Sequence, residues 1–258
     1  MAKIYAVISG KGGVGKTTTT INLGTSLNYL GEDVVIVDAN LTTPNVGIQL
    51  GAPIVPVTLN HVLSNQAKFE EAIYEHESGT KVMPASLSLR ETEKIDYKKF
   101  PELMKKVKKI TSFVLIDSAA GLGEEARTAI DACDEIIIVT NPEMSAVTDA
   151  LKTIKLAEEK GKPIAGVILT RYRGKNYEMS IPNIRDMLEI PILGIIPEDD
   201  AIRESQALKN AVIHTHPRSK AAKTYFNISK RILGEDVDFV DPKNLGLVGR
   251  FLQSIGLR

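Results

Sequence analysis

A single cysteine, an even balance of charge and the lack of a long hydrophobic run restrict what this 258-residue chain can be. Cys133 excludes a disulfide framework and a cysteine-only metal or iron–sulfur site within one chain, and we expect it to be a buried apolar residue. Lys+Arg and Asp+Glu number 32 each, so no global basic field attracts nucleic acid. No apolar run approaches the ~20 residues of a membrane-spanning helix.

The start of the chain and the rarity of cysteine both favour a cytoplasmic protein. Residues 1–10 read as a strand, because only Lys3 is charged and no signal-peptide cleavage site follows. A single cysteine fits a reducing compartment. Any attachment to a membrane is therefore expected to be peripheral and reversible, on its cytoplasmic face.

The composition divides the chain into three parts. No linker or repeat interrupts residues 1–234, which we expect to form one domain. An acidic linker follows at 235–242, and the tail at 243–258 contains Lys243, Arg250 and Arg258 but no acidic residue. The net charge thus changes sign within a few residues.

Short apolar runs alternate with amphipathic stretches through the domain. Strands are expected at residues 4–8, 34–38, 82–84, 113–117, 136–140, 164–170 and 192–196, and helices at 16–30, 101–110, 124–133, 143–160, 201–209 and 219–233. Several strands are almost continuously apolar, as parallel strands covered on both faces are. The alternation predicts an α/β fold with one doubly wound, mainly parallel sheet and helices on both faces.

A phosphate-binding loop is predicted between the first strand and the first helix. The spacing G-x-x-x-x-G-K-[ST] runs from Gly10 to Thr17, and its glycines let successive backbone N–H groups point at phosphate oxygens. We expect Lys16 to reach the β- and γ-phosphates and Thr17 to hold Mg²⁺. The expected nucleotide-binding residues of the loop are Gly10, Lys11, Gly12, Gly13, Val14, Gly15, Lys16, Thr17 and Thr18.

Two aspartates end predicted strands beside this loop. Asp38 ends the second strand and Asp117 the strand at 113–117, and the carboxyl ends of parallel strands face the ligand crevice. Either aspartate could hold Mg²⁺ through water. A single aspartate could instead be an ordinary cap after a strand, but this explanation is weaker for two aspartates beside the loop. The candidate metal residues are therefore Thr17, Asp38 and Asp117.

The loop and several later segments together resemble the MinD/ParA family of ATPases, and among them most closely the MinD branch, which regulates the site of cell division. The resemblance covers roughly residues 1–233. It is carried by the deviant phosphate loop at 11–18 and by the segments at 117–121, 140–143, 169–172 and 196–199, which occur in the family's order.

The resemblance implies a homodimer with ATP at the interface, in which Lys11 of each subunit reaches the phosphates bound by the other. ATP would then join the subunits and ADP release them. It also implies an adenine pocket, formed by Thr170, Arg171, Pro197, Glu198 and Asp199. ATP and Mg²⁺ are the implied substrate and cofactor.

One position departs from the family's pattern. The family usually has Asp-x-Asp after the second strand, where this chain has Asp38-Ala39-Asn40. Asparagine keeps an acceptor oxygen but has no negative charge and cannot serve as a base. We expect slow basal turnover and a long-lived ATP dimer. Lys11, Lys16 and Asn40 are the candidate catalytic residues.

The tail has the pattern of a helix that lies on a membrane surface. Its apolar residues share one face of a helix, and Arg250 lies on the opposite face. These candidate membrane residues are Leu245, Val248, Phe251, Leu252 and Ile255. Members of the MinD branch end in such a helix, and docking of the tail on its own domain is the alternative.

Together these features predict an ATP-dependent dimerising switch that cycles on and off the membrane. It would regulate division-site placement or spatial positioning through an unidentified protein regulator or cargo. One alternative is a ParA-type partition ATPase that binds DNA nonspecifically through Arg218, Lys220, Lys223, Lys230 and Arg231, although the zero net charge makes nucleic acid the less favoured partner. A positioning factor for a motility or chemosensory apparatus would share the same chemistry.

Overall fold

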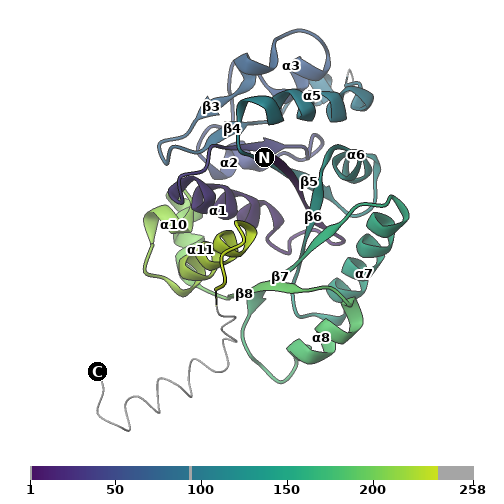
Figure 1. Ribbon diagram of the computed structural model, residues 1–258. Helices are drawn as coiled ribbons and strands as arrows, with labels where there is room; N and C mark the ends of the chain where they lie inside the picture. The colour runs from purple at the N-terminus through teal and green to yellow at the C-terminus, as the bar shows by residue number, and fades with distance from the viewer. Residues whose placement is uncertain (1, 93–94, 238–258) are drawn as a thin grey trace.

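The computed structural model describes residues 2–92 and 95–237, and one eight-stranded sheet forms its centre (Figure 1). The strand order is β3-β4-β2-β5-β1-β6-β7-β8. The strands are β1 (Lys3–Ser9), β2 (Val34–Asp38), β3 (Tyr74–Glu75), β4 (Lys81–Met83), β5 (Phe113–Ala120), β6 (Glu135–Thr140), β7 (Ile164–Tyr172) and β8 (Ile192–Pro197). All neighbouring strands are parallel except β3 and β4, which confirms the predicted doubly wound, mainly parallel sheet.

Helices cover both faces of the sheet because the side chains of its strands alternate between two apolar cores. On β2, for example, Val34 and Ile36 face one core, whereas Val35 and Val37 face the other. The first core is covered by α1 (Lys16–Tyr29), α10 (Val212–Thr215) and α11 (Lys220–Ile232). The second is covered by α3 (Leu59–Leu63), α5 (Phe100–Val107), α6 (Glu124–Ala132), α7 (Met144–Glu159) and α8 (Ile181–Leu188).

The remaining helices are mostly short. They are α2 (Val46–Gln49), α4 (Leu89–Thr92) and α9 (Asp200–Ala207), with 3-10 turns at Phe69–Ala72, Tyr97–Lys99 and Lys108–Ile110. Every predicted strand and helix is present, with ends that differ by a few residues. The sequence prediction missed β3, α2, α3, α4, α8 and α10.

Cys133 is buried, as predicted, but it lies just after α6 and not within a helix, because α6 ends at Ala132. Burial raises the pKa of its thiol to about 12, so the sulfur stays protonated at neutral pH. The structure therefore gives this residue the chemistry of a small apolar side chain.

The end of the described chain is tied to the domain at β8. Arg231 near the end of α11 donates hydrogen bonds to the carbonyls of Leu193 and Val237. Most of the predicted acidic linker and the whole predicted tail lie outside the described residues, including Leu245, Val248, Phe251, Leu252 and Ile255. Among the helices that are described, none is long and apolar enough to span a membrane.

Candidate functional site

The phosphate loop connects the carboxyl end of β1 to the start of α1, and its glycines are there for steric reasons. Gly13 and Gly15 have φ angles of 78° and 87°, in the left-handed region that favours glycine. Gly10 has a different reason, since a Cβ built on it would lie 2.2 Å from the carbonyl oxygen of Asp149 on α7. The loop is thus held tightly between α7 and α1.

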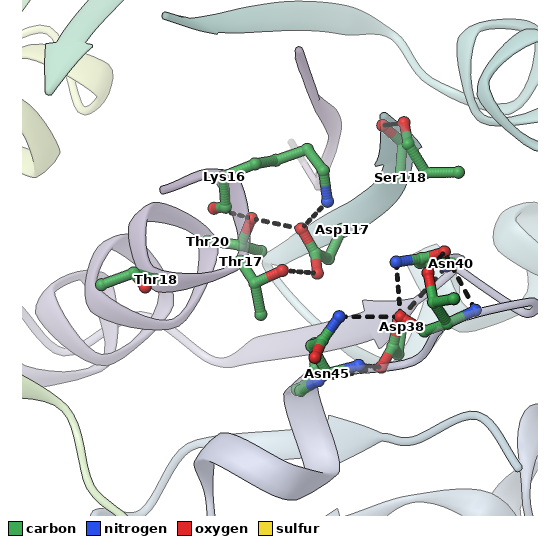
Figure 2. Close-up of polar contacts among 12 residues, drawn as sticks. Lys16, Thr17, Thr18, Thr20, Asp38, Asn40, Asn45, Asp117 and Ser118 are labelled. Carbon is green, nitrogen blue, oxygen red and sulfur yellow. Dashed lines mark hydrogen bonds and ion pairs between the residues drawn. The ribbon is translucent and has the colours of Figure 1, made fainter. Parts of the chain in front are cut away.

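The carboxylate of Asp117 accepts hydrogen bonds from several polar side chains at the start of α1 (Figure 2). Asp117 on β5 accepts hydrogen bonds from Lys16 Nζ at 2.6 Å and from Thr17 Oγ1 at 2.7 Å. Thr20, one turn further along α1, donates to the same carboxylate at 3.2 Å. The structure therefore brings the predicted phosphate-binding lysine, the predicted metal-binding threonine and one predicted metal-binding aspartate together.

Asp38 lies beside Asp117, because the two residues face each other in the register of β2 and β5. It is fully buried, and its carboxylate accepts hydrogen bonds from the backbone N–H groups of Asn40, Asn45 and Val46. Burial and the neighbouring Asp117 charge raise the pKa of Asp38 to about 7.

The donor set at this point suits Mg²⁺. Two carboxylates and a threonine hydroxyl are hard oxygen ligands, and Mg²⁺ typically binds one or two carboxylates together with substrate phosphates and water. In the part of the chain that the structure describes, no group of three or more His, Cys, Asp or Glu side chains could hold a metal ion alone. The residues thus fit a cation that shares its ligands with a phosphate.

Two adjoining cavities open beside the loop. The larger, of about 530 Å³, is lined by loop residues including Lys16 and Thr17 and is called the phosphate cavity here. The smaller, of about 180 Å³, is lined by all five residues of the predicted adenine pocket: Thr170, Arg171, Pro197, Glu198 and Asp199. The two cavities share Gly15, Thr18, Arg171 and Gln206. Because the cavities adjoin, a nucleotide could place its phosphates in the larger one and its base in the smaller one.

Two side chains of the predicted adenine pocket, those of Thr170 and Asp199, make contacts that hold the fold together. The Thr170 hydroxyl hydrogen bonds with the Val14 carbonyl at 2.6 Å and with the Thr140 carbonyl at 3.1 Å. Asp199 accepts from the backbone N–H groups of Ala201 and Ala221 at the starts of α9 and α11. Thr170 and Asp199 therefore help to fix the shape of the smaller cavity.

Three predicted residues of the loop do not line either cavity. Gly10 packs on Asp149, and Val14 lies in a small apolar cluster with Val7, Val139 and Ala146. Lys11 lies on the surface, with its Nζ 3.2 Å from Glu143 Oε2 and 3.4 Å from Ser145 Oγ at the start of α7.

The side chain of Asn40 is occupied within its own loop. Its amide nitrogen donates to the Thr43 carbonyl at 2.6 Å, and its oxygen accepts from the Thr43 hydroxyl at 3.0 Å. Asn40 lines the phosphate cavity, but this geometry commits its amide to the loop.

Several residues of the site were not predicted from the sequence. Gln206 on α9 donates to Thr18 Oγ1 at 2.8 Å, and Thr18 in turn donates to Gln49 Oε1 on α2 at 3.3 Å. Thr42, Thr43, Asn45 and Glu125 also line the phosphate cavity. None belongs to a motif, so only the packing of their elements could reveal them.

The fold and the site define a phosphate-loop nucleotide-binding protein. The chain belongs to the CobQ/CobB/MinD/ParA nucleotide-binding domain family, whose model matches residues 5–212. This confirms the family predicted from the sequence.

Individual relatives agree with this assignment. An uncharacterised ATP-binding protein of Methanocaldococcus jannaschii is 34% identical over 256 residues, which cover 99% of this chain and 97% of that protein. The septum site-determining protein MinD of Pyrococcus horikoshii, complexed with Mg-ADP, is 36% identical with a TM-score of 0.86, over 90% of this chain and 96% of that one. The MinC:MinD cell division protein complex of Aquifex aeolicus contains a chain that is 28% identical with a TM-score of 0.84, over 93% and 99%. The chain is a MinD-like ATPase.

Proposed function

We propose that this chain is an ATP-dependent dimerising switch, which hydrolyses ATP and regulates division-site placement or another spatial arrangement. The observation that carries the proposal is the different placement of two loop lysines. Lys16 lines the phosphate cavity of its own chain, whereas Lys11 lies outside that cavity, against the exposed start of α7. A cation beside the site but not in it can serve a second subunit, where it would neutralise γ-phosphate charge as an arginine finger does.

Each part of the site has a task in this proposal. The backbone N–H groups of residues 10–18 and the Lys16 ammonium hold the phosphates, and the smaller cavity holds adenine. Thr17, Asp38 and Asp117 would hold Mg²⁺ directly or through water. When bound, Mg²⁺ neutralises phosphate charge. The Mg-ADP complex of the Pyrococcus horikoshii relative supports this choice of cofactor.

A slow basal rate is part of the proposal. Phosphoryl transfer depends mainly on positioning and electrostatics, so an asparagine at position 40 need not abolish hydrolysis. Because the Asn40 amide is committed to Thr43, it contributes little to the positioning of water. The ATP-bound dimer would therefore persist unless a partner accelerates turnover.

The partners of the switch are also proposed. The tail at 243–258 would hold the dimer on the cytoplasmic face of the membrane, and a protein regulator or cargo would bind the ATP-bound form. The existence of a MinC:MinD complex in Aquifex aeolicus supports a protein partner.

The alternative of DNA binding through α11 is less well supported. Lys230 pairs with Glu235 at 3.3 Å, and the Arg231 guanidinium is tied to the carbonyls of Leu193 and Val237. Only Arg218, Lys220 and Lys223 of the basic set remain for phosphate contacts, which predicts weak and salt-sensitive binding to DNA.

The test is the oligomeric state of Lys11→Ala with each nucleotide. We expect the wild-type chain to be dimeric with Mg-ATP and monomeric with Mg-ADP, measured by light scattering during size exclusion. Lys11→Ala should bind ATP with an affinity within about threefold of wild type yet remain monomeric, because Lys11 does not line its own cavity. Lys155→Ala, at an exposed lysine on α7, is the matched control. ATP-dependent dimerisation of Lys11→Ala would contradict the proposal.

A further inference from the structure

Glu125 is the only carboxylate among the described side chains that line the phosphate cavity. It lies in the first turn of α6, shortly after β5 ends. Asp38 and Asp117 are fully buried beneath the cavity and bind the backbone and the start of α1. Of Asp38, Asp117 and Glu125, Glu125 is thus the one that lines the space where phosphates would bind.

The side chain of Glu125 is held by one of its two oxygens. Oε1 accepts hydrogen bonds from the Thr42 N–H at 3.0 Å, the Thr42 hydroxyl at 2.6 Å and the Tyr97 hydroxyl at 3.3 Å. Burial, followed by the charge of Glu125, raises the pKa of Tyr97 to about 12, so Tyr97 keeps its proton to donate. Within the described chain, no hydrogen bond engages Oε2, so this residue of the cavity lining keeps an oxygen that a water could bind.

Glu125 also lies against the loop that contains Asn40. Thr42, which it binds, follows Asn40 by two residues, and both residues line the phosphate cavity. The resemblance to the MinD/ParA family implies an acid at position 40, where this chain has an uncharged asparagine whose amide donates to Thr43 and accepts from it. The negative charge that is missing at position 40 is therefore present on the facing element.

We propose that Glu125 is the catalytic carboxylate that positions the attacking water and accepts its proton during ATP hydrolysis. This inference rests on the proposed ATPase function. In the step, the water oxygen forms a bond to the γ-phosphorus. The bond to the bridging oxygen breaks, and its electron pair stays on ADP. The water proton passes to Glu125 Oε2 and then to solvent.

The decisive variant is Glu125→Gln, which keeps the size of the side chain and an acceptor for Thr42 but removes the charge. We expect Glu125→Gln to bind Mg-ATP and dimerise like wild type, while its single-turnover hydrolysis rate falls about 100-fold, the lower end of what general bases contribute.

A second variant moves the carboxylate instead of removing it. In the double variant Asn40→Asp with Glu125→Gln, an acid returns to position 40, and we expect most of the lost rate to return. Glu125→Ala, which removes the contact with Thr42 as well as the charge, measures the structural contribution of the side chain. Rescue by a carboxylate on the other element would not follow from a purely structural role.

Three outcomes would overturn the role of Glu125. They are a wild-type rate in Glu125→Gln, failure of the double variant to exceed the rate of Glu125→Gln, and loss of ATP-dependent dimerisation in Glu125→Gln. The proposed function fails separately, if the wild-type chain binds Mg-ATP but does not dimerise. Light scattering and single-turnover rates on the same samples distinguish the two failures.

Discussion

At the scale of residues, the site depends on two buried carboxylates that face each other across β2 and β5. Asp117 pairs with Lys16 and accepts hydrogen bonds from Thr17 and Thr20, whereas the hydrogen-bond donors to Asp38 in the described chain are backbone N–H groups. Two like charges in a buried site disfavour the simultaneous ionisation of both. Burial first and the charge of Asp117 second raise the pKa of Asp38 to about 7, which gives the protein a pH dependence near neutrality.

We predict that the apo protein loses stability as the pH rises from about 4 to about 7 through Asp38. A carboxyl whose pKa is 3.8 when unfolded and about 7 when folded binds more protons in the native state over this interval. Urea unfolding at pH 5, 6, 7 and 8 without Mg²⁺ should therefore show Asp38→Asn gaining stability relative to wild type up to about pH 7. A difference between the two proteins that does not change with pH would contradict this.

Some residues of the site could be predicted from motifs and the ends of strands, whereas others are placed only by the packing of distant elements. Lys16, Thr17, Asp38 and Asp117 could be predicted because the motif and the ends of strands place them at one edge of the sheet. Glu125 could not, because its position depends on how α6 packs beside the loop after β2, which no local pattern reports. The same holds for Gln206, which reaches Thr18 from α9.

At the scale of elements, the strands and long helices could be predicted because their periodicity extends over enough residues. The short helices between β2 and β5 could not, since α2, α3 and α4 have only four or five residues each. The start of α8, in contrast, does have a recognisable signal in the sequence. Ser180 caps its first turn and Pro182 lies at its start, a combination that marks the beginning of a helix.

The phosphate loop offers a matched pair of glycine substitutions. We predict that Gly10→Ala destabilises the apo protein by about 1–3 kcal/mol, because its Cβ would overlap the backbone of α7. Gly12→Ala is the control, since a Cβ there meets nothing within 4 Å and the residue has no positive φ. In thermal unfolding without nucleotide, the midpoint temperature of Gly10→Ala should lie well below that of Gly12→Ala. Equal midpoints would show that the contact with Asp149 does not hold the loop.

At the scale of the whole molecule, the phosphate loop and the end of the described chain lie near opposite ends of the sheet's strands. The phosphate loop follows the carboxyl end of β1, whereas Arg231 ties Val237 to Leu193 at the amino end of β8. We propose that dimerisation, which brings two tails together, is the change that couples nucleotide binding to the tail.

We predict that the full-length chain sediments with anionic phospholipid vesicles in Mg-ATP and not in Mg-ADP. One amphipathic tail binds lipid weakly, and two tails in one dimer bind with avidity that can exceed either affinity by 10²–10⁴. Lys11→Ala should stay in the supernatant, as should a chain that ends at residue 242. A constitutive dimer, made by fusing a parallel coiled coil to the N-terminus of Lys11→Ala, should sediment with either nucleotide. If the coiled-coil fusion stays in the supernatant, or the shortened chain sediments like the full-length one, avidity of paired tails is not the basis of membrane binding. Sedimentation with DNA in place of vesicles would instead favour the basic residues of α11.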